Sequence, residues 1–277
     1  MRRLLIGILL SCVIRGVAAD ALFYQPQTGD AVVEPDQWAE IWRQSKAHGF
    51  DRVIVQWTRY GDEDFGGDHG WLRNALRQAR QAGLGLVVGL YQDPDYFSRL
   101  NDLSGLSRYW RELFDQTLLQ QRQLLSEGVV ADAWYLPAEL SDRTFNDQDR
   151  RKDLLEQLNG LMQHLQQPLQ LSAYSTGQLA PAANARWLDE LHSVGAMVWW
   201  QDGVGVAELP TLVRTAYVQA LSCETGIVSE AFRRTSVGNE PFTAVPADPQ
   251  RYSSCHPSAV FSLRYMPWGV ALRRATP

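Results

Sequence analysis

Short runs of β-branched and aromatic residues alternate along the chain with longer stretches in which apolar residues recur every three or four positions. The short runs predict strands and the longer stretches predict amphipathic helices. Their regular alternation favours βα units that build a parallel sheet. The expected strands are Leu22–Gln25, Arg52–Trp57, Gly85–Tyr91, Ala133–Leu136, Leu169–Tyr174, Ala196–Gln201, Ile227–Ala231 and Val260–Tyr265.

The helical periodicity is clearest between the third and fourth strands, where Leu106, Trp110, Leu113 and other apolar residues follow a helical spacing. The expected helices are 35–48, 71–82, 105–127, 147–166, 184–193 and 207–221. Residues 233–258 are polar and predict no helix, and few residues follow the eighth strand. The pattern therefore predicts an α/β protein, a (β/α)₈ TIM barrel with an incomplete last helix, in which residues 20–277 form a single domain.

The N-terminus has the composition of an export signal. Arg2 and Arg3 precede the apolar run Leu4–Ile14, and small residues at Val17–Ala19 suit cleavage before Asp20. Residues 1–19 are therefore interpreted as a signal peptide, which predicts a periplasmic or secreted protein without a transmembrane segment. Leu9–Cys12 loosely resembles a lipoprotein cleavage box, so lipidation at Cys12 is the open alternative.

Charge and composition narrow the class of ligand. Loss of residues 1–19 removes three arginines and no acidic residue, which changes the formal net charge from −5 to −8. An acidic chain without a basic cluster is a poor partner for nucleic acid or for an anionic membrane. Hydrophobic residues make up 45% of the chain, which is typical of a globular protein with a large core.

Two cysteines, Cys223 and Cys255, remain after the predicted signal peptide. They precede the seventh and eighth strands, so both are expected at the N-terminal face of neighbouring strands. In an oxidising compartment such a pair either forms a disulfide or stays as two thiols, and the sequence leaves both alternatives open.

The candidate site follows from the fold, because functional residues of such barrels lie at the C-terminal ends of the strands. Two glutamates occupy these ends: Glu139 follows the fourth strand and Glu230 ends the seventh. Two carboxyl groups across a barrel mouth can share the acid and nucleophile roles of glycoside cleavage. The alternative is that either glutamate is a solvated loop residue or an arginine partner.

The other strand ends carry amide and aromatic side chains that suit a sugar. Amides and a carboxylate can hold hydroxyl groups, and aromatic rings can stack on the apolar faces of sugar rings. Asp202 can equally serve as a turn or helix-capping residue, and Trp134 and Trp199 are expected to face the helices. The predicted substrate-binding residues are Tyr24, Gln25, Gln56, Trp57, Tyr91, Tyr174, Trp200, Gln201, Asp202, Tyr265 and Trp268.

No feature of the sequence predicts a metal or an organic cofactor. The histidines are dispersed, without the spacing of zinc ligands. An acidic loop after the second strand contains Asp62, Glu63, Asp64 and Asp68; it is interpreted as a solvated loop, with a calcium site as the alternative.

Several motifs together resemble one bacterial family. They are Phe23–Pro26, Val55–Thr58, Trp134–Asp142 and Gln201–Val206, and the resemblance extends to Phe261–Met266. The chain is identified as resembling domain-of-unknown-function family 4434, which is grouped with glycoside-hydrolase-like TIM barrels. This resemblance implies the barrel rather than a particular reaction.

A looser resemblance is to glycoside hydrolases of clan A. Those enzymes carry an acid/base glutamate after strand four and a nucleophilic glutamate near the end of strand seven, and Glu139 and Glu230 match these positions. The chain departs from them at Ala138, where the clan usually has an asparagine that contacts the sugar 2-hydroxyl.

The resulting hypothesis is a glycoside hydrolase that acts on a bacterial exopolysaccharide, with Glu139 as general acid/base and Glu230 as nucleophile or electrostatic stabiliser. The alternatives are a non-catalytic periplasmic glycan-binding protein and an accessory subunit of polysaccharide secretion machinery. The sequence does not specify the sugar, the linkage or the stereochemical outcome.

Overall fold

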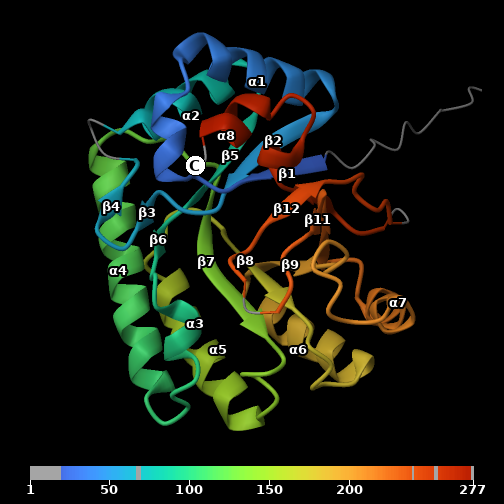
Figure 1. The fold of residues 1–277 in the computed structure, drawn as a ribbon. Coiled ribbons are helices and arrows are strands. Elements are labelled where there is room, and N and C mark those ends of the chain that lie inside the picture. The colour runs from blue at the N-terminus through green and yellow to red at the C-terminus, as the bar shows by residue number, and fades with distance from the viewer. Residues whose placement is uncertain (1–19, 67–69, 239, 253–254, 276–277) are drawn as a thin grey trace, which may run out of the picture.

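A computed structural model describes residues 20–66, 70–238, 240–252 and 255–275; the predicted signal peptide and Cys12 lie outside these ranges. Parallel strands close into a barrel in the order β1-β13-β10-β9-β8-β7-β5-β2 (Figure 1). The predicted eight-stranded TIM barrel is confirmed. Its strands are β1 (Asp20–Tyr24), β2 (Phe50–Val55), β5 (Gly85–Gly89), β7 (Ala133–Ser141), β8 (Leu169–Tyr174), β9 (Met197–Gln201), β10 (Gly226–Glu230) and β13 (Ser258–Phe261).

Helices surround this barrel where the periodicity predicted them. They are α1 (Pro35–Ala47), α2 (Trp71–Gln81), α4 (Leu106–Ser126), α5 (Gln148–Met162), α6 (Pro181–Ser193) and α7 (Thr211–Ala220). Pro35 begins α1, where its missing N–H costs no hydrogen bond. Gly49 adopts a φ of 93° just after the helix, a conformation that glycine reaches without strain.

The last βα unit is incomplete, as the sequence indicated. Between β10 and β13 the chain forms the antiparallel pair β11 (Phe232–Arg234) and β12 (Ala244–Pro246) instead of a helix. After β13 come a 3₁₀ turn, η2 (Leu263–Tyr265), and the short helix α8 (Val270–Ala275). The remaining elements are η1 (Thr28–Val32), β3 (Arg59–Tyr60), β4 (Glu63–Asp64), β6 (Tyr91–Gln92) and α3 (Tyr96–Arg99).

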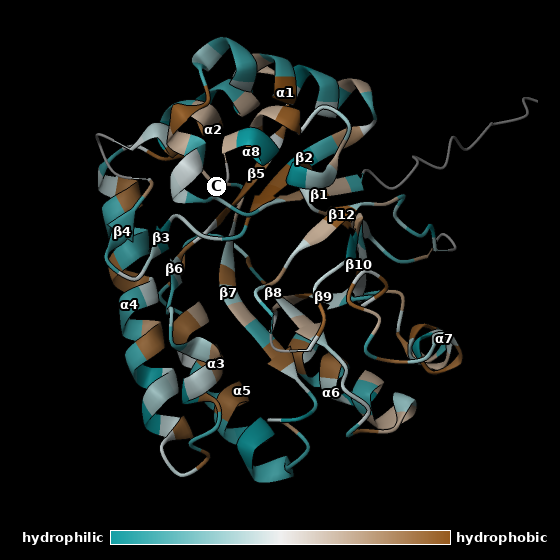
Figure 2. Cartoon of the chain, in the orientation of Figure 1, coloured by the Kyte–Doolittle hydropathy of each residue, from teal (hydrophilic) through white to brown (hydrophobic). Residues whose placement is uncertain are grey.

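Apolar side chains pack in two layers, because successive strand residues point to opposite faces. The inner layer fills the barrel and includes Phe23, Tyr135 and Trp199. The outer layer lies between the strands and the helices and includes Tyr24, Trp134 and Trp200. The helices turn hydrophobic stripes toward the barrel and hydrophilic faces outward (Figure 2).

Strand β7 is longer than the sequence predicted, and this extension positions Glu139. The register between β7 and β8 shifts between Tyr135 and Glu139, after which Glu139 lies opposite Ser172. A bulge of this kind bends a strand and re-aims its side chains. Glu139 is thereby held by a strand rather than by the loop that was expected to follow one.

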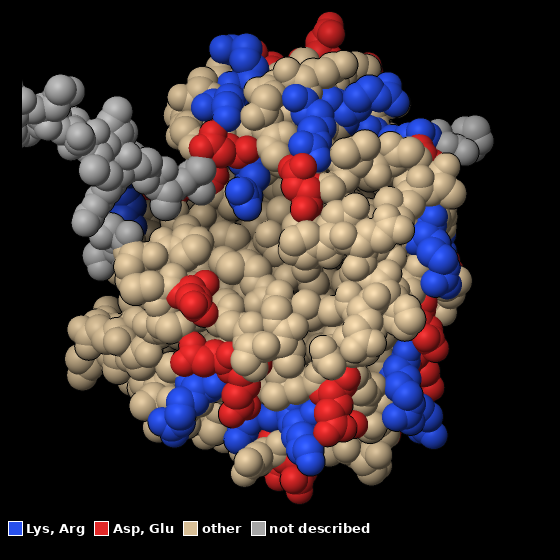
Figure 3. Space-filling model, turned by 180° about the vertical axis from the view of Figure 1, so that it is seen from behind, with Lys and Arg blue, Asp and Glu red and all other residues tan. Residues whose placement is uncertain are grey.

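The described helices and one face of the surface bear on membrane contact and on charge distribution. No helix among the described residues is both long enough and apolar enough to cross a membrane. On the face opposite to that of Figure 1, acidic and basic side chains intermingle around the periphery (Figure 3).

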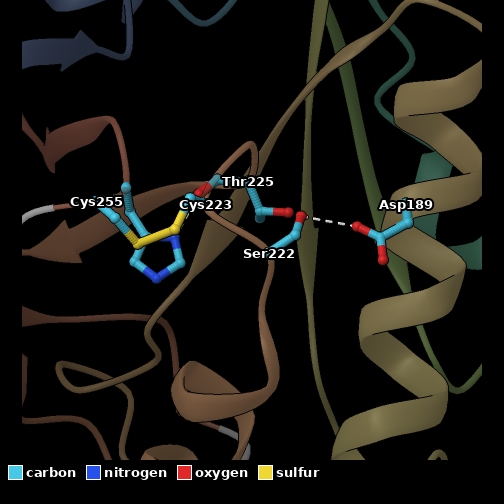
Figure 4. The surroundings of a disulfide bond; sticks show 6 residues. Asp189, Ser222, Cys223, Thr225 and Cys255 are labelled. Atoms are coloured by element: carbon cyan, nitrogen blue, oxygen red, sulfur yellow. Dashed lines mark hydrogen bonds between the residues drawn. A yellow bond between two sulfur atoms is a disulfide. The ribbon is translucent and has the colours of Figure 1, made fainter.

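Cys223 and Cys255 form a disulfide, which resolves the alternative that the sequence left open. Their Cα atoms are 5.2 Å apart, and the bond closes a segment with a sequence separation of 32 (Figure 4). The segment contains β10, β11 and β12. The disulfide therefore ties the polar excursion between β10 and β13 to the N-terminal face of the barrel.

We expect the double variant Cys223→Ser/Cys255→Ser to be less stable than the parent by about 3–4 kcal/mol. The reason is that the open chain regains the loop entropy that the crosslink removes from the unfolded state. Urea unfolding of parent and variant measures the difference. Equal midpoints under oxidising conditions would contradict the expectation.

Candidate active site

One pocket opens beside the C-terminal ends of β7, β8, β9 and β10. Its cavity volume is about 300 Å³. The strand ends supply Glu139, Tyr174, Gln201 and Glu230. The connecting loops and helices supply Phe97, Arg143, Ser175, Thr176, Asp202, Gly203, Val206, Glu208, Leu209 and Arg214, and Trp200 completes the wall.

Glu139 is held by amide side chains from two other strands. Gln56 Nε2 donates to Glu139 Oε1 at 3.3 Å, and Gln25 Nε2 donates to Gln56 Oε1 at 3.0 Å. Gln201 lies close enough to Glu139 to lower its pKa, while its Nε2 donates to Ser172 Oγ at 3.2 Å. Burial is the main cause that raises the pKa of Glu139, and the two amides oppose it. Neutral partners thus leave Glu139 able to carry a proton.

Glu230 is buried at the end of β10, with one carboxylate oxygen fixed by backbone. Its Oε2 accepts N–H groups from Gly205 at 2.6 Å and Val206 at 3.1 Å. Burial, the nearby Asp202 charge and, more weakly, Glu139 raise the pKa of Glu230 to about 7. The Glu139 charge thus reaches Glu230 across the pocket.

Asp202 organises the loop that holds Glu230. Its Oδ1 accepts the backbone N–H of Val204 at 3.1 Å and of Glu230 at 3.3 Å, and Tyr252 donates its hydroxyl to Oδ2 at 3.1 Å. Burial raises the pKa of Asp202. Asp202 is 1% exposed, and these hydrogen bonds fit the turn role that the sequence offered as one alternative.

The close approach of the 203–206 loop to Glu230 requires glycine at position 205. A Cβ there would lie 2.5 Å from the Phe232 carbonyl oxygen and 2.9 Å from Glu230 Oε2. Both contacts are far below van der Waals distance. The glycine therefore permits the backbone N–H of residue 205 to reach the carboxylate.

We expect Gly205→Ala to destabilise the fold by about 1–3 kcal/mol, because the added methyl group must displace backbone or the Glu230 carboxylate. Gly160→Ala is the matched control, since a Cβ there meets nothing within 4 Å. Its helical position predicts a neutral or stabilising effect. Thermal melts of both variants test the contrast, which equal shifts in Tm would contradict.

The structure brings six of the predicted residues to the pocket: Glu139, Glu230, Tyr174, Trp200, Gln201 and Asp202. Gln25 and Gln56 lie next to it through their link to Glu139. Trp200 forms part of the wall, but it is buried, its Nε1 donates to Ser175 Oγ at 3.0 Å, and its ring packs on Tyr217 of α7. It is therefore a fixed wall rather than an exposed stacking platform.

Three predicted ligand contacts are wrong because their side chains point outward into the helical layer. Tyr24 is fully buried against Trp38 and Trp42 of α1 and donates to Asp30 Oδ2 at 2.8 Å. Trp57 belongs to the same outer core. Trp268 stacks on His48, which caps α1 at the opposite end of the barrel, and donates to Ser45.

Tyr91 and Tyr265 do not line the pocket either. Tyr91 lies in β6, which pairs with β3 outside the barrel. Tyr265 lies in η2 beyond β13 and packs against Phe232, with ring centroids 5.1 Å apart. Trp199 also differs from its expected place: it fills the barrel interior and donates to Gln170 Oε1 at 2.9 Å, whereas Trp134 faces the helices as expected.

Several pocket residues escaped the sequence analysis because they lie on loops and helices rather than at strand ends. Arg143 follows β7, Glu208 precedes α7, and Arg214 lies in α7. Within the described ranges no group of three or more potential ligands could hold a metal ion. In the acidic loop, Asp64 pairs with Arg59 at 3.0 Å, and Asp68 lies outside the described residues.

Comparison with known protein families and with curated proteins identifies the family of this chain. Residues 20–254 match the model of the Domain of unknown function (DUF4434) family. The uncharacterized protein YbcH of Escherichia coli (strain K12) is 33% identical over 272 residues, which cover 90% of this chain and 91% of YbcH. The chain belongs to the DUF4434 family.

Solved structures with the same fold include two glycoside-hydrolase-like barrels. A putative alpha-L-fucosidase from Bacteroides thetaiotaomicron VPI-5482 aligns with a TM-score of 0.58 and 16% identity, covering 99% of this chain and 98% of its own. A GH18 chitinase from Pseudoalteromonas aurantia aligns with a TM-score of 0.51 and 10% identity, covering 93% and 99%. At these identities the likeness concerns the fold.

Proposed function

We propose that this DUF4434 protein is an exported glycoside hydrolase that cleaves a bacterial exopolysaccharide. The observation that carries the proposal is the placement of two carboxyl groups, the half-buried Glu139 on β7 and the buried Glu230 on β10, in one pocket at the C-terminal end of the barrel. The fold of the fucosidase-like and chitinase structures is consistent with this chemistry.

Each glutamate has a separate task in the proposed reaction. Glu139 donates its proton to the glycosidic oxygen, so that the leaving sugar departs as a neutral alcohol. Glu230, ionised, faces the anomeric carbon and stabilises the positive charge that develops there or bonds to it. The backbone N–H groups of Gly205 and Val206 fix one Glu230 oxygen and leave Oε1 for the sugar.

The amides around Glu139 complete the binding site. Gln56 uses a side-chain donor on Glu139 and Gln201 uses one on Ser172, and both amides retain further polar capacity for sugar hydroxyls. Tyr174 lines the pocket with its ring. The compartment is part of the proposal, supported by the signal-like residues 1–19 and by the disulfide.

A non-catalytic glycan-binding role is the second candidate, and Ala138 favours it. Ala138 is fully buried beside Glu139 and offers no polar atom where clan A enzymes usually have an asparagine. A protein with this site could hold a sugar through the amides without the contact that assists cleavage. The two candidate functions differ in whether the protein releases oligosaccharide products from the glycan that it binds.

A screen of bacterial exopolysaccharides separates these functions. The parent and Glu139→Gln are each incubated with the panel, and binding and released oligosaccharides are measured together. Products from the parent but not from Glu139→Gln support hydrolysis. Binding by both proteins without products supports the glycan-binding role, and neither binding nor products from any member overturns the proposal.

The hydrolysis rate should rise with pH through about 7. Glu230 must be ionised to act, and its raised pKa means that it is protonated below that value. Replacing Asp202 by asparagine removes one charge that raises this pKa, so the rise in activity should move to lower pH. The pH dependence of kcat/KM for parent and Asp202→Asn measures both. A rate that falls as pH rises through 7 would give Glu230 the proton-donor role instead.

A further inference from the structure

Two arginines, Arg143 and Arg214, line the same pocket as the two glutamates. A neutral sugar can be held by amides and hydroxyls alone, so guanidinium groups in a sugar pocket require a separate explanation. The usual explanation for an arginine in a protein pocket is an ion pair with a neighbouring carboxylate. The contacts of each arginine test whether that explanation applies.

Arg214 is held in place by neutral acceptors. It lies near the start of α7 and is partly buried. Its guanidinium donates to the backbone oxygen of Leu209 and, at 3.2 Å, to Thr211 Oγ1. Neither acceptor carries a charge, so the guanidinium is oriented without an ion pair among the described residues. Its remaining donors are available to an incoming acceptor.

Arg143 is exposed and lies in the turn after β7. Within the described part of the chain it makes no ion pair with Glu208, the exposed carboxylate of the pocket. The turn itself is rigidly tied to the next loop, because the buried carboxylate of Asp142 accepts the backbone N–H groups of Thr176, Gln178 and Leu179. Arg143 therefore extends from a fixed turn, exposed and without an ion pair among the described residues.

Among the described residues none of the other carboxyl groups of the pocket forms an ion pair with these arginines, although Arg214 lies close enough to Asp202 to lower its pKa. Glu139 is bonded to amides, Glu230 to backbone N–H groups, and Asp202 to backbone and Tyr252. Two arginines thus line the cavity, while the hydrogen bonds of its carboxyl groups go to amides, backbone N–H groups and Tyr252. Arginine forks match planar oxyanions and bind them with charge-assisted hydrogen bonds.

We propose that the pocket selects a negatively charged sugar, one whose carboxylate or sulfate group is bound by Arg143 and Arg214. The inference rests on the proposed glycan function and adds the class of substrate. The charged group sits on the side of the pocket formed by the loop after β7 and the start of α7. A polysaccharide of neutral sugars would leave both arginines without a ligand.

The test measures binding with Glu139→Gln, so that a cleaved ligand does not confuse the result. The probes are oligosaccharides of galacturonate, mannuronate and glucuronate, each beside its methyl ester, which has the same sugar without the charge. A sulfated galactan oligosaccharide and its unsulfated form make the second arm. Isothermal titration calorimetry at low and high salt gives the affinities.

We expect at least one charged oligosaccharide to bind about 10–100-fold more tightly than its neutral counterpart, the worth of one or two charge-assisted hydrogen bonds. Arg214→Gln and Arg143→Gln, in the same background, should each lower the affinity for the charged form toward that of its neutral counterpart. Arg108→Gln is the control, since Arg108 is exposed on α4 outside the pocket. If the uronate oligosaccharides show the preference, the bound group is a carboxylate; if the sulfated galactan shows it, the bound group is a sulfate.

Equal affinity for charged and neutral forms, or a preference that survives both arginine substitutions, overturns the inference while the glycan function stands. Failure of every charged and neutral oligosaccharide to bind, together with the absence of products in the exopolysaccharide screen, overturns the proposed function as well.

Discussion

Glu139→Gln should lower the rate of glycoside cleavage by about 10²–10⁴-fold, the usual contribution of a positioned general acid. Glutamine has nearly the same shape and can keep polar contacts with Gln56 and Gln201, but it has no proton to deliver to the leaving oxygen. Affinity for the oligosaccharide should therefore change only a few-fold. The loss falls on kcat rather than on KM.

Two measurements locate the effect in proton donation. Sugars with an activated leaving group, such as a nitrophenolate, need little protonation, so Glu139→Gln should cleave them at close to the parental rate. Glu208→Gln is the matched control, because Glu208 is an exposed carboxylate of the same pocket. A comparable loss in both variants, or an equal loss on activated and natural leaving groups, would contradict the acid role of Glu139.

The barrel was predictable because its signals are local and repeated. Each strand is a short β-branched or aromatic run and each helix has its own period, so Leu169–Tyr174 was placed with both bounds correct. The closing unit was also indicated, since the polar residues after β10 could not form an amphipathic helix. They form the pair β11 and β12 instead.

The sequence predicted only in part which strand side chains point into the barrel and which point toward the helices. The errors share one physical cause. Side chains alternate along a strand, so two consecutive residues cannot both point into the barrel. With Gln201 inward, Trp199 must be inward and Trp200 outward, which is the reverse of the expectation. The same parity places Gln56 inward and Trp57 outward.

The pocket residues outside the strands were not predictable in the same way. Arg143, Glu208 and Arg214 reach the site through loops and a helix whose paths depend on tertiary contacts, such as the four hydrogen bonds that Asp142 accepts from the loop after β8. Gly205 gave no local signal of its role, because that role is set by Phe232 and Glu230, far along the chain.

At pH 8, Glu230→Gln should unfold with a free energy about 3 kcal/mol higher than that of the parent. In the folded protein the pKa of Glu230 is raised to about 7 from its ordinary value of 4.5, so the folded protein binds the proton more tightly than the unfolded chain does. Stability from this group is present below pH 4.5 and is lost as pH rises toward 7. A shift of this size corresponds to about 3 kcal/mol.

The pH dependence of that gain is the sharper part of the prediction. Glutamine does not titrate, and its side-chain oxygen can still accept the N–H groups of Gly205 and Val206. The advantage of Glu230→Gln should therefore be close to zero at pH 4 and grow between pH 4.5 and 7. Urea unfolding of parent and variant across this range, with Glu208→Gln as the exposed control, measures it.

A constant difference at all pH values, or a variant less stable than the parent at pH 8, would show that ionisation of the buried Glu230 does not lower the free energy of unfolding. The expected result would mean that the fold tolerates an ionised carboxylate in its interior at the expense of stability. Packing gives no reason for such a group, because a glutamine of the same size would satisfy the same backbone donors. The reason must then lie in the charge itself, which an oxocarbenium-like transition state beside Glu230 would use.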